Sequence, residues 1–184
     1  MAACTCLALI LLSAPVAPRP MAVIPFTDNG KLVSLYVRIG HSNPRVFSLD
    51  SGASASVIDS RTASELHMRA DGSRLGTGAG AGRVRFAIFK NVSLALGGAR
   101  WTAPKAYGIS LNSVGTALHE DGLVGSDLFL RFVVDVDYAR HRLSLYEPKT
   151  FRYTGAGTAI PLTIAKHVPH AAVTIKVRGR PAQV

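Results

Sequence analysis

Cysteine is nearly absent from this 184-residue chain, since its only two cysteines, Cys4 and Cys6, lie at the extreme N-terminus. They cannot form a disulfide framework or a cysteine-based metal centre. The six histidines show no spacing typical of metal ligands, so no metal site is expected. Charged residues are also scarce, at 17%, while hydrophobic residues reach 48%, which excludes a disordered chain. The composition therefore indicates a folded domain with a buried hydrophobic core.

Long hydrophobic runs are missing as well, and no stretch of the chain is long enough to span a bilayer. Residues 7–12 form a short apolar run, followed by small residues and prolines up to residue 20. This order is typical of the hydrophobic core and cleavage region of a secretory signal peptide. We therefore predict a signal peptide over residues 1–20, no transmembrane segment, and an exported protein that is periplasmic or secreted.

Basic clusters are absent although the formal net charge is +10. The arginines stand apart along the chain, and no basic run with interleaved aromatic residues occurs. Nucleic-acid-binding segments usually concentrate their positive charge on one face or along one helix. No nucleic-acid partner is therefore expected, and the charge is interpreted as a solvated surface.

Period-two alternation is the main structural pattern that is present. Val33, Leu35, Val37 and Ile39 line one side of a predicted half-buried strand. Further short apolar segments follow, separated by glycine and proline turns. Only two short helices are predicted, at residues 60–67, with Ser60 as N-cap, and at residues 127–132. Many short strands with little helix favour an all-β barrel or sandwich.

A carboxylate follows directly on one of these apolar segments. Residues 46–49 form a predicted strand that runs into Asp50, Ser51 and Gly52. An aspartate directly after a buried strand is unfavourable unless it is hydrogen-bonded or used in chemistry. Ser51 offers a short hydroxyl to neighbouring backbone, and Gly52 lets its N–H approach the carboxylate. Since the triplet alone also occurs in ordinary turns, its context has to decide.

Three features accompany the triplet in a fixed order along the chain. Ala53 follows it directly, the segment 72–82 holds five glycines, and residues 123–125 are two apolar residues plus glycine before a predicted helix. With these features, residues 24–147 resemble the retropepsin-like aspartic proteases, in the branch found in bacterial exported proteins. In that family a flap hairpin covers the substrate, and an apolar-apolar-glycine segment threads under the active-site loop.

The resemblance implies an all-β, retropepsin-like acid protease barrel with one short helix near the C-terminal end of the lobe. It implies an aspartic endopeptidase acting on peptides or proteins, with Asp50 as the catalytic acid and no cofactor. The residues implied for loop support are Ser51, Gly52, Ala53, Leu123, Val124 and Gly125, and those implied for the flap are Gly76, Gly78 and Gly80. Asp127 is interpreted as an acidic residue that stabilises the start of a helix rather than as a catalytic acid. Asp135 and Asp137 are expected at the surface.

Such a protease needs two aspartates that face each other, but the chain has a single Asp-Ser-Gly triplet. Two adjacent carboxylates cannot both ionise, so they share a proton and activate one water. The second carboxylate is expected from a homodimer or from a second lobe. Residues 159–162 repeat the Ile-Pro pattern of residues 23–26, and an alternating strand follows each. We predict a protease lobe over residues 21–150 and, over 151–184, the start of a second, truncated lobe or a terminal strand pair.

Two other functions stay open on the sequence alone. A non-catalytic retropepsin-like module would bind peptides or dimerise, and it would share every hydrophobic feature of the protease. A basic surface-binding domain without an active site would use only the net charge. The protease hypothesis differs from both in requiring a second aspartate, and the chain is expected to be inactive alone if that lobe is missing.

Overall fold

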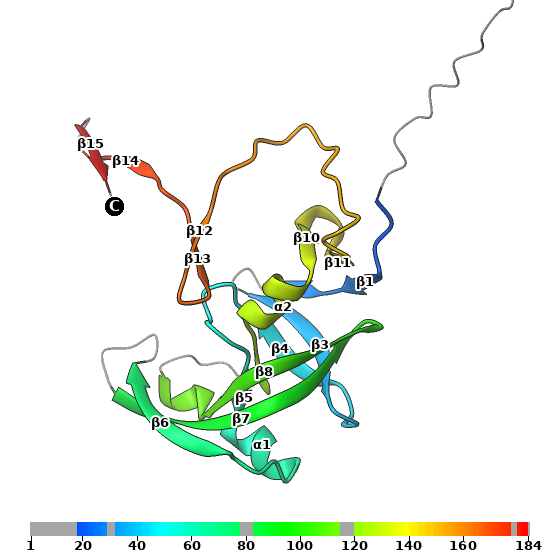
Figure 1. Cartoon of the computed structure of the whole chain (residues 1–184), viewed down its shortest axis with the longest axis vertical. Coiled ribbons are helices and arrows are strands. Elements are labelled where there is room, and N and C mark those ends of the chain that lie inside the picture. The colour runs from blue at the N-terminus through cyan, green and yellow to red at the C-terminus, as the bar shows by residue number, and fades with distance from the viewer. Residues whose placement is uncertain (1–17, 29–31, 78–82, 115–119, 178–179, 184) are drawn as a thin grey trace, which may run out of the picture.

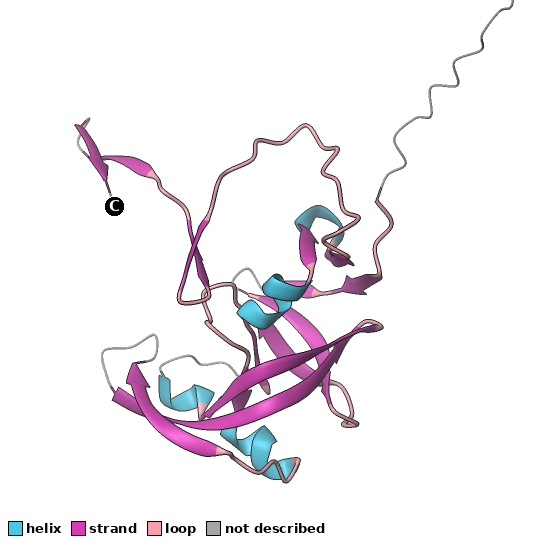
Figure 2. Cartoon of the chain, in the orientation of Figure 1, coloured by secondary structure: helices cyan, strands magenta, loops and turns pink. Residues whose placement is uncertain are grey.

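The structure is a computed structural model that describes residues 18–28, 32–77, 83–114, 120–177 and 180–183. Most of the predicted signal peptide, residues 1–17, lies outside the described residues. No helix within the described ranges is long and apolar enough to cross a membrane. Strands dominate the described chain and its helices are short (Figure 2). The predicted all-β class is confirmed.

The main sheet has eight strands, and the chain closes it into a barrel-like lobe (Figure 1). In spatial order the strands are β2 (Thr27–Asp28), β3 (Val33–Ile39), β4 (Arg45–Leu49), β9 (Gly122–Val124), β5 (Val57–Asp59), β8 (Ala99–Ile109), β7 (Arg83–Leu96) and β6 (Gly72–Thr77). The long β7 also pairs with β3, from Val37 opposite Leu96 to Ile39 opposite Leu94. This additional pairing joins strands from the two halves of the sheet.

The predicted alternation of β3 is confirmed, because its four apolar residues are all buried. Burial of a side chain of this kind stabilises the fold by about 1.5–3 kcal/mol. Phe47 on β4 and Ile58 on β5 belong to the same hydrophobic core and are fully buried. The strands that lead to residue 50 and away from it are therefore fixed by packing.

A smaller sheet of three strands contains both ends of the lobe. β1 (Ala22–Pro25) and β10 (Val133–Asp137) pair with opposite edges of β11 (Arg142–Tyr146), all antiparallel. The β10–β11 turn contains the short 3-10 helix η2 (Tyr138–Arg140). Asp135 is exposed as expected, whereas Asp137 is partly buried and pairs with Arg140 and Arg142. The Arg140 side-chain hydrogen bond lowers the pKa of Asp137.

Two short α-helices accompany the sheets, together with the 3-10 helix η1 (Leu111–Val114). Helix α1 (Ser60–Glu65) lies where a helix was predicted, but its N-cap is Asp59 rather than Ser60. The Asp59 carboxylate accepts the N–H of Arg61 at 2.9 Å and that of Leu111 at 2.9 Å. An aspartate at this position satisfies a free N–H of the first helical turn and, through its second oxygen, also holds η1. Helix α2 (Ser126–Arg131) is the short helix predicted near the end of the lobe.

The hairpins of β6, β7 and β8 differ in detail from the sequence-based expectation. Two separate strands were expected within residues 84–96, but β7 is one strand of 14 residues with Asn91 at a positive φ of 51°. The glycine-rich segment contributes a strand, β6, which pairs with β7. Gly97 and Gly98, with φ of 55° and 97°, form the tight β7–β8 turn that their sequence predicted.

The C-terminal tail forms two separate hairpins outside the main sheets. β12 (Thr163–Ala165) pairs with β13 (Val168–His170), and β14 (Thr174–Val177) pairs with β15 (Arg180–Gln183). Figure 1 shows both hairpins extending from a long loop that arches away from the lobe. The exposed aliphatic residues at and between these hairpins include Ile160, Leu162, Ile164, Val173 and Ile175. The lobe does not bury them.

Candidate active site

Asp50 lies immediately after β4, where the barrel opens into a short loop. Its backbone N–H donates to the Val124 carbonyl at 2.9 Å, which continues the pairing of β4 with β9. Its side chain is partly exposed, and Oδ1 accepts the N–H of Gly52 at 2.9 Å. The triplet thus forms a tight loop in which glycine donates to the aspartate, as the sequence predicted. Its second carboxylate oxygen has no bond within the described chain.

The segment 123–125 passes directly beside this loop. β9 lies between β4, with which it is parallel, and β5, with which it is antiparallel. Leu123 pairs with Ser48 on one side and Val57 on the other, while Val124 pairs with Leu49. A strand inserted between the strands before and after the loop holds both ends of that loop. The structure therefore brings Leu123, Val124 and Gly125 together with Asp50.

Hydrogen bonds clamp the loop to the start of α2. The N–H of Ser126 donates to the Ala53 carbonyl at 2.9 Å, and its hydroxyl donates to the Ser54 carbonyl at 2.7 Å. The N–H of Gly125 donates to the buried hydroxyl of Ser56 at 3.1 Å. Roles for Ala53 and Gly125 were predicted from the sequence, but none was predicted for Ser126 or Ser56. Small hydroxyl residues give no periodic pattern, so only the chain path identifies them.

Asp127 has a larger structural role than the sequence indicated. It lies in the first turn of α2 as predicted, but its carboxylate does not cap that helix. Instead it accepts the Ser56 N–H, the Ser56 hydroxyl at 3.0 Å and the Trp101 indole N–H at 2.7 Å. The side chain thereby ties the active-site loop to β8.

Replacing Asp127 with alanine is expected to destabilise the lobe by about 2–4 kcal/mol, because the buried donors of Ser56 and Trp101 would lose their acceptor. Urea denaturation of the purified chain measures this change. Asp135→Ala, at an exposed position on β10, is the matched control and should change stability by less than about 0.5 kcal/mol. Equal stability of the two variants would contradict the clamping role of Asp127.

For Ser51 and for the predicted flap glycines, the described structure shows few or no contacts with the Asp50 loop. Ser51 is exposed, and its hydroxyl has no hydrogen bond to any other described residue. Gly76 lies on β6 opposite Val84, in the hairpin that β6 forms with β7. Gly78 and Gly80 lie outside the described residues. The flap assignment therefore stays a prediction, although a hairpin does occupy the predicted place.

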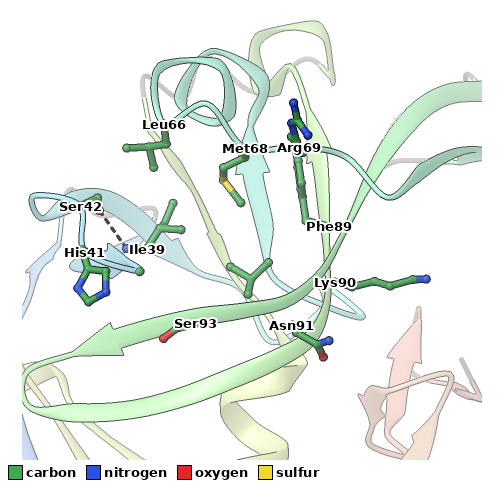
Figure 3. Close-up of a pocket in the computed structure, with 12 residues that line it drawn as sticks. Ile39, His41, Ser42, Leu66, Met68, Arg69, Phe89, Lys90, Asn91 and Ser93 are labelled. Atoms are coloured by element: carbon green, nitrogen blue, oxygen red, sulfur yellow. Dashed lines mark hydrogen bonds between the residues drawn. The ribbon is translucent and has the colours of Figure 1, made fainter.

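A surface hollow of about 400 Å³ lies elsewhere on the lobe. Figure 3 shows Leu66 and Met68 on one side of it and Ile39 and His41 on another. The hollow adjoins the end of β3, whereas Asp50 lies beside the start of that strand. The seven residues of β3 separate the two places by about 20 Å. The hollow is therefore separate from the Asp50 site. No group of three or more histidines, cysteines or acidic residues that could hold a metal ion occurs in the described ranges.

The site is therefore a carboxylate on the loop between β4 and β5, with the third strand β9 inserted between these two strands, which is the arrangement that the sequence led us to expect of an acid protease fold. Comparison with known proteins gives the family. A family model described as aspartyl protease matches residues 35–128, about half of the chain, and the chain belongs to that family. The match includes Asp50, the threading segment and Asp127.

A solved structure supports the fold. The chain is similar to the crystal structure of a retropepsin-like aspartic protease from Rickettsia conorii, with a TM-score of 0.50 and 19% sequence identity. The similarity covers 68% of this chain and 89% of that one. No curated protein matches the chain. The fold is therefore retropepsin-like, the family supports a protease-type function, and retropepsin-like folds usually work as dimers or paired lobes.

Proposed function

We propose that this chain supplies one half-site of an aspartic endopeptidase, with Asp50 as its catalytic acid. The observation that carries the proposal is the clamped loop, which holds the Asp50 carboxylate partly exposed while Gly52 donates to only one of its oxygens. The other oxygen is left to meet a water molecule or a second carboxylate. The buried Asp59, by contrast, has both oxygens bonded to backbone N–H groups of α1 and η1 and has none left for chemistry.

In the proposed reaction, Asp50 and its counterpart share one proton because two adjacent negative charges are unfavourable. The ionised carboxylate takes a proton from water as the water oxygen attacks the peptide carbonyl carbon. The protonated carboxyl donates to the carbonyl oxygen and stabilises the tetrahedral intermediate. The bond from carbon to nitrogen then breaks, and the leaving nitrogen receives a proton from the carboxyl pair.

The C-terminal tail supports the proposal that a second lobe completes the site. Five of its apolar residues are 44–66% exposed, with Ile175 and Ile160 at the two limits, so a partner that covered them would add hydrophobic burial. Its elements also repeat the order seen at the start of the lobe. A segment at residues 159–162 precedes two successive hairpins, as β1 precedes the β2–β3 and β3–β4 hairpins. A tandem lobe and a second copy of the chain both fit this surface.

Peptide hydrolysis in the acid range, blocked by a statine-type transition-state mimic, is the expected result for the assembled protease. If a second copy supplies the partner carboxylate, activity per chain should rise with protein concentration over the range in which light scattering detects dimer. If a tandem lobe supplies it, activity should not depend on concentration. Hydrolysis that the mimic does not inhibit would contradict the proposal, and saturable peptide binding without hydrolysis would favour a non-catalytic module.

Export is also part of the proposal, because the sequence of residues 1–20 is typical of a signal peptide. Mass spectrometry of the protein isolated from its native cells tests this point. An intact N-terminus at Met1 would contradict it.

A further inference from the structure

A second, smaller apolar cluster lies outside the main core of the lobe. Its buried residues are Val57, Ile109 and Leu111. The partly buried residues packed against it are Val84, Phe86, Tyr107 and Leu123. Because these four side chains keep part of their surface open, the cluster can still receive an apolar group from outside.

Strand register places this cluster on the same face of the sheet as Asp50. Ser48 pairs with Leu123, which pairs on its other side with Val57. Val57 in turn pairs with Tyr107. Directly paired residues project to the same face of a sheet, and Asp50 follows two residues after Ser48, so alternation brings it to that face as well. From β4 to β8 there are three strand spacings, or about 14 Å, which is the length of about four residues of extended peptide.

Arg74 adds a positive charge at the far side of the cluster. It lies on β6 directly opposite Phe86, and its guanidinium carbon lies 6.0 Å from the centre of the Tyr107 ring. The Phe86 and Tyr107 rings meet edge to face at 5.7 Å. Arg74 is exposed, but the aromatic face beneath it favours one position of its planar guanidinium.

This charge has no ion-pair partner among the described residues. The carboxylate of Asp71, three residues earlier, accepts the backbone N–H of Lys90 at 2.8 Å. A guanidinium that lies over an aromatic ring, here at 6.0 Å from the ring centre, keeps its N–H groups free to bind a carboxylate through two parallel hydrogen bonds. Arg74 therefore presents an anion-binding group beside an apolar surface that shares a face with Asp50.

We propose that the protease selects polypeptides in which an apolar side chain near the scissile bond packs on this apolar cluster and is accompanied by an aspartate or glutamate that binds Arg74. The inference rests on the function proposed above and names its substrate class. The apolar side chain packs on Leu123, Val57 and Tyr107, and the acidic one lies within about four residues of the scissile bond.

The test uses pairs of fluorogenic peptides that differ only by Glu or Gln, at each position within about four residues of the scissile bond. At one position the wild-type protease should cleave the Glu peptide with a kcat/KM about tenfold above that of its Gln partner, as one charge-assisted interaction allows. Arg74→Gln should bring this ratio to about 1, and Arg74→Glu should favour a Lys peptide at the same position. The same pairs, built around a statine unit, give a second readout by equilibrium binding, which needs no turnover.

Arg85→Gln is the matched control. Arg85 lies on the same hairpin, opposite Leu75, and alternation points it to the other face from Phe86. The same charge is removed, yet the Glu-to-Gln ratio should stay at its wild-type value. Cleavage with a ratio unaffected by Arg74→Gln overturns the inference and leaves the proposed function standing. Arg74-dependent binding without cleavage supports the inference and counts against the proposed function. A wild-type protein that neither binds nor cleaves any of the peptides overturns both.

Discussion

Replacing Asp50 with asparagine is expected to lower kcat for peptide hydrolysis by at least about 10³-fold, without unfolding the lobe. Asparagine has the shape of aspartate, and its Oδ1 can still accept the N–H of Gly52. It cannot ionise, however, so it can neither share a proton with a second carboxylate nor take one from water. Initial rates with a fluorogenic peptide, together with circular dichroism of the variant, measure the two parts of this expectation.

Asp135→Asn is the control for this substitution, because it makes the same chemical change at an exposed position on β10. Its kcat and its stability should match those of the wild type. An Asp50→Asn variant that keeps wild-type turnover would remove Asp50 from the mechanism. The protease proposal for this chain would then have no catalytic residue.

Gly125→Ala is expected to destabilise the lobe by about 3 kcal/mol and to remove its activity. A β-carbon at this position would overlap the carbonyl group of Ala55 and would lie 2.8 Å from the backbone nitrogen of Ser56. Both obstacles are backbone atoms of the active-site loop. They cannot move aside without breaking the clamp that Ser126 and Asp127 form with the same loop. Urea denaturation and peptide hydrolysis by the same preparation measure both effects.

Gly72→Ala is the control for this change. A β-carbon at Gly72 would meet nothing within 4 Å, and the residue lies on β6, in the hairpin with β7. Its stability should stay within about 0.5 kcal/mol of the wild type. If Gly125→Ala were equally harmless, the close packing of β9 against the loop would not be needed for folding.

The strand pattern and the position of the carboxylate could be predicted from local sequence. Alternating residues such as Leu35 and Val37 identify a half-buried strand wherever it lies in the fold, and both are buried. Asp50 was identified because a predicted strand runs into the Asp-Ser-Gly triplet and because the features that follow the triplet resemble an aspartic protease. For β6 the residues showed no strand pattern, because glycines obscure alternation, and a hairpin was expected there only from the resemblance; pairing with β7 stabilises the strand despite the low strand propensity of glycine.

The sequence by itself determined the all-β class, the period-two strands of the lobe and the tight loop at Asp50, because these depend on residues close together in the chain. The tertiary structure decided that β9 pairs with both β4 and β5, since the sequence indicated its path beside the loop only through the family resemblance. It also decided that Asp127 binds Ser56, 71 residues away, and that Arg74 lies over Tyr107. These contacts depend on the path of the chain through space, since hydrogen bonds and ring contacts between distant residues leave no periodic pattern in the sequence.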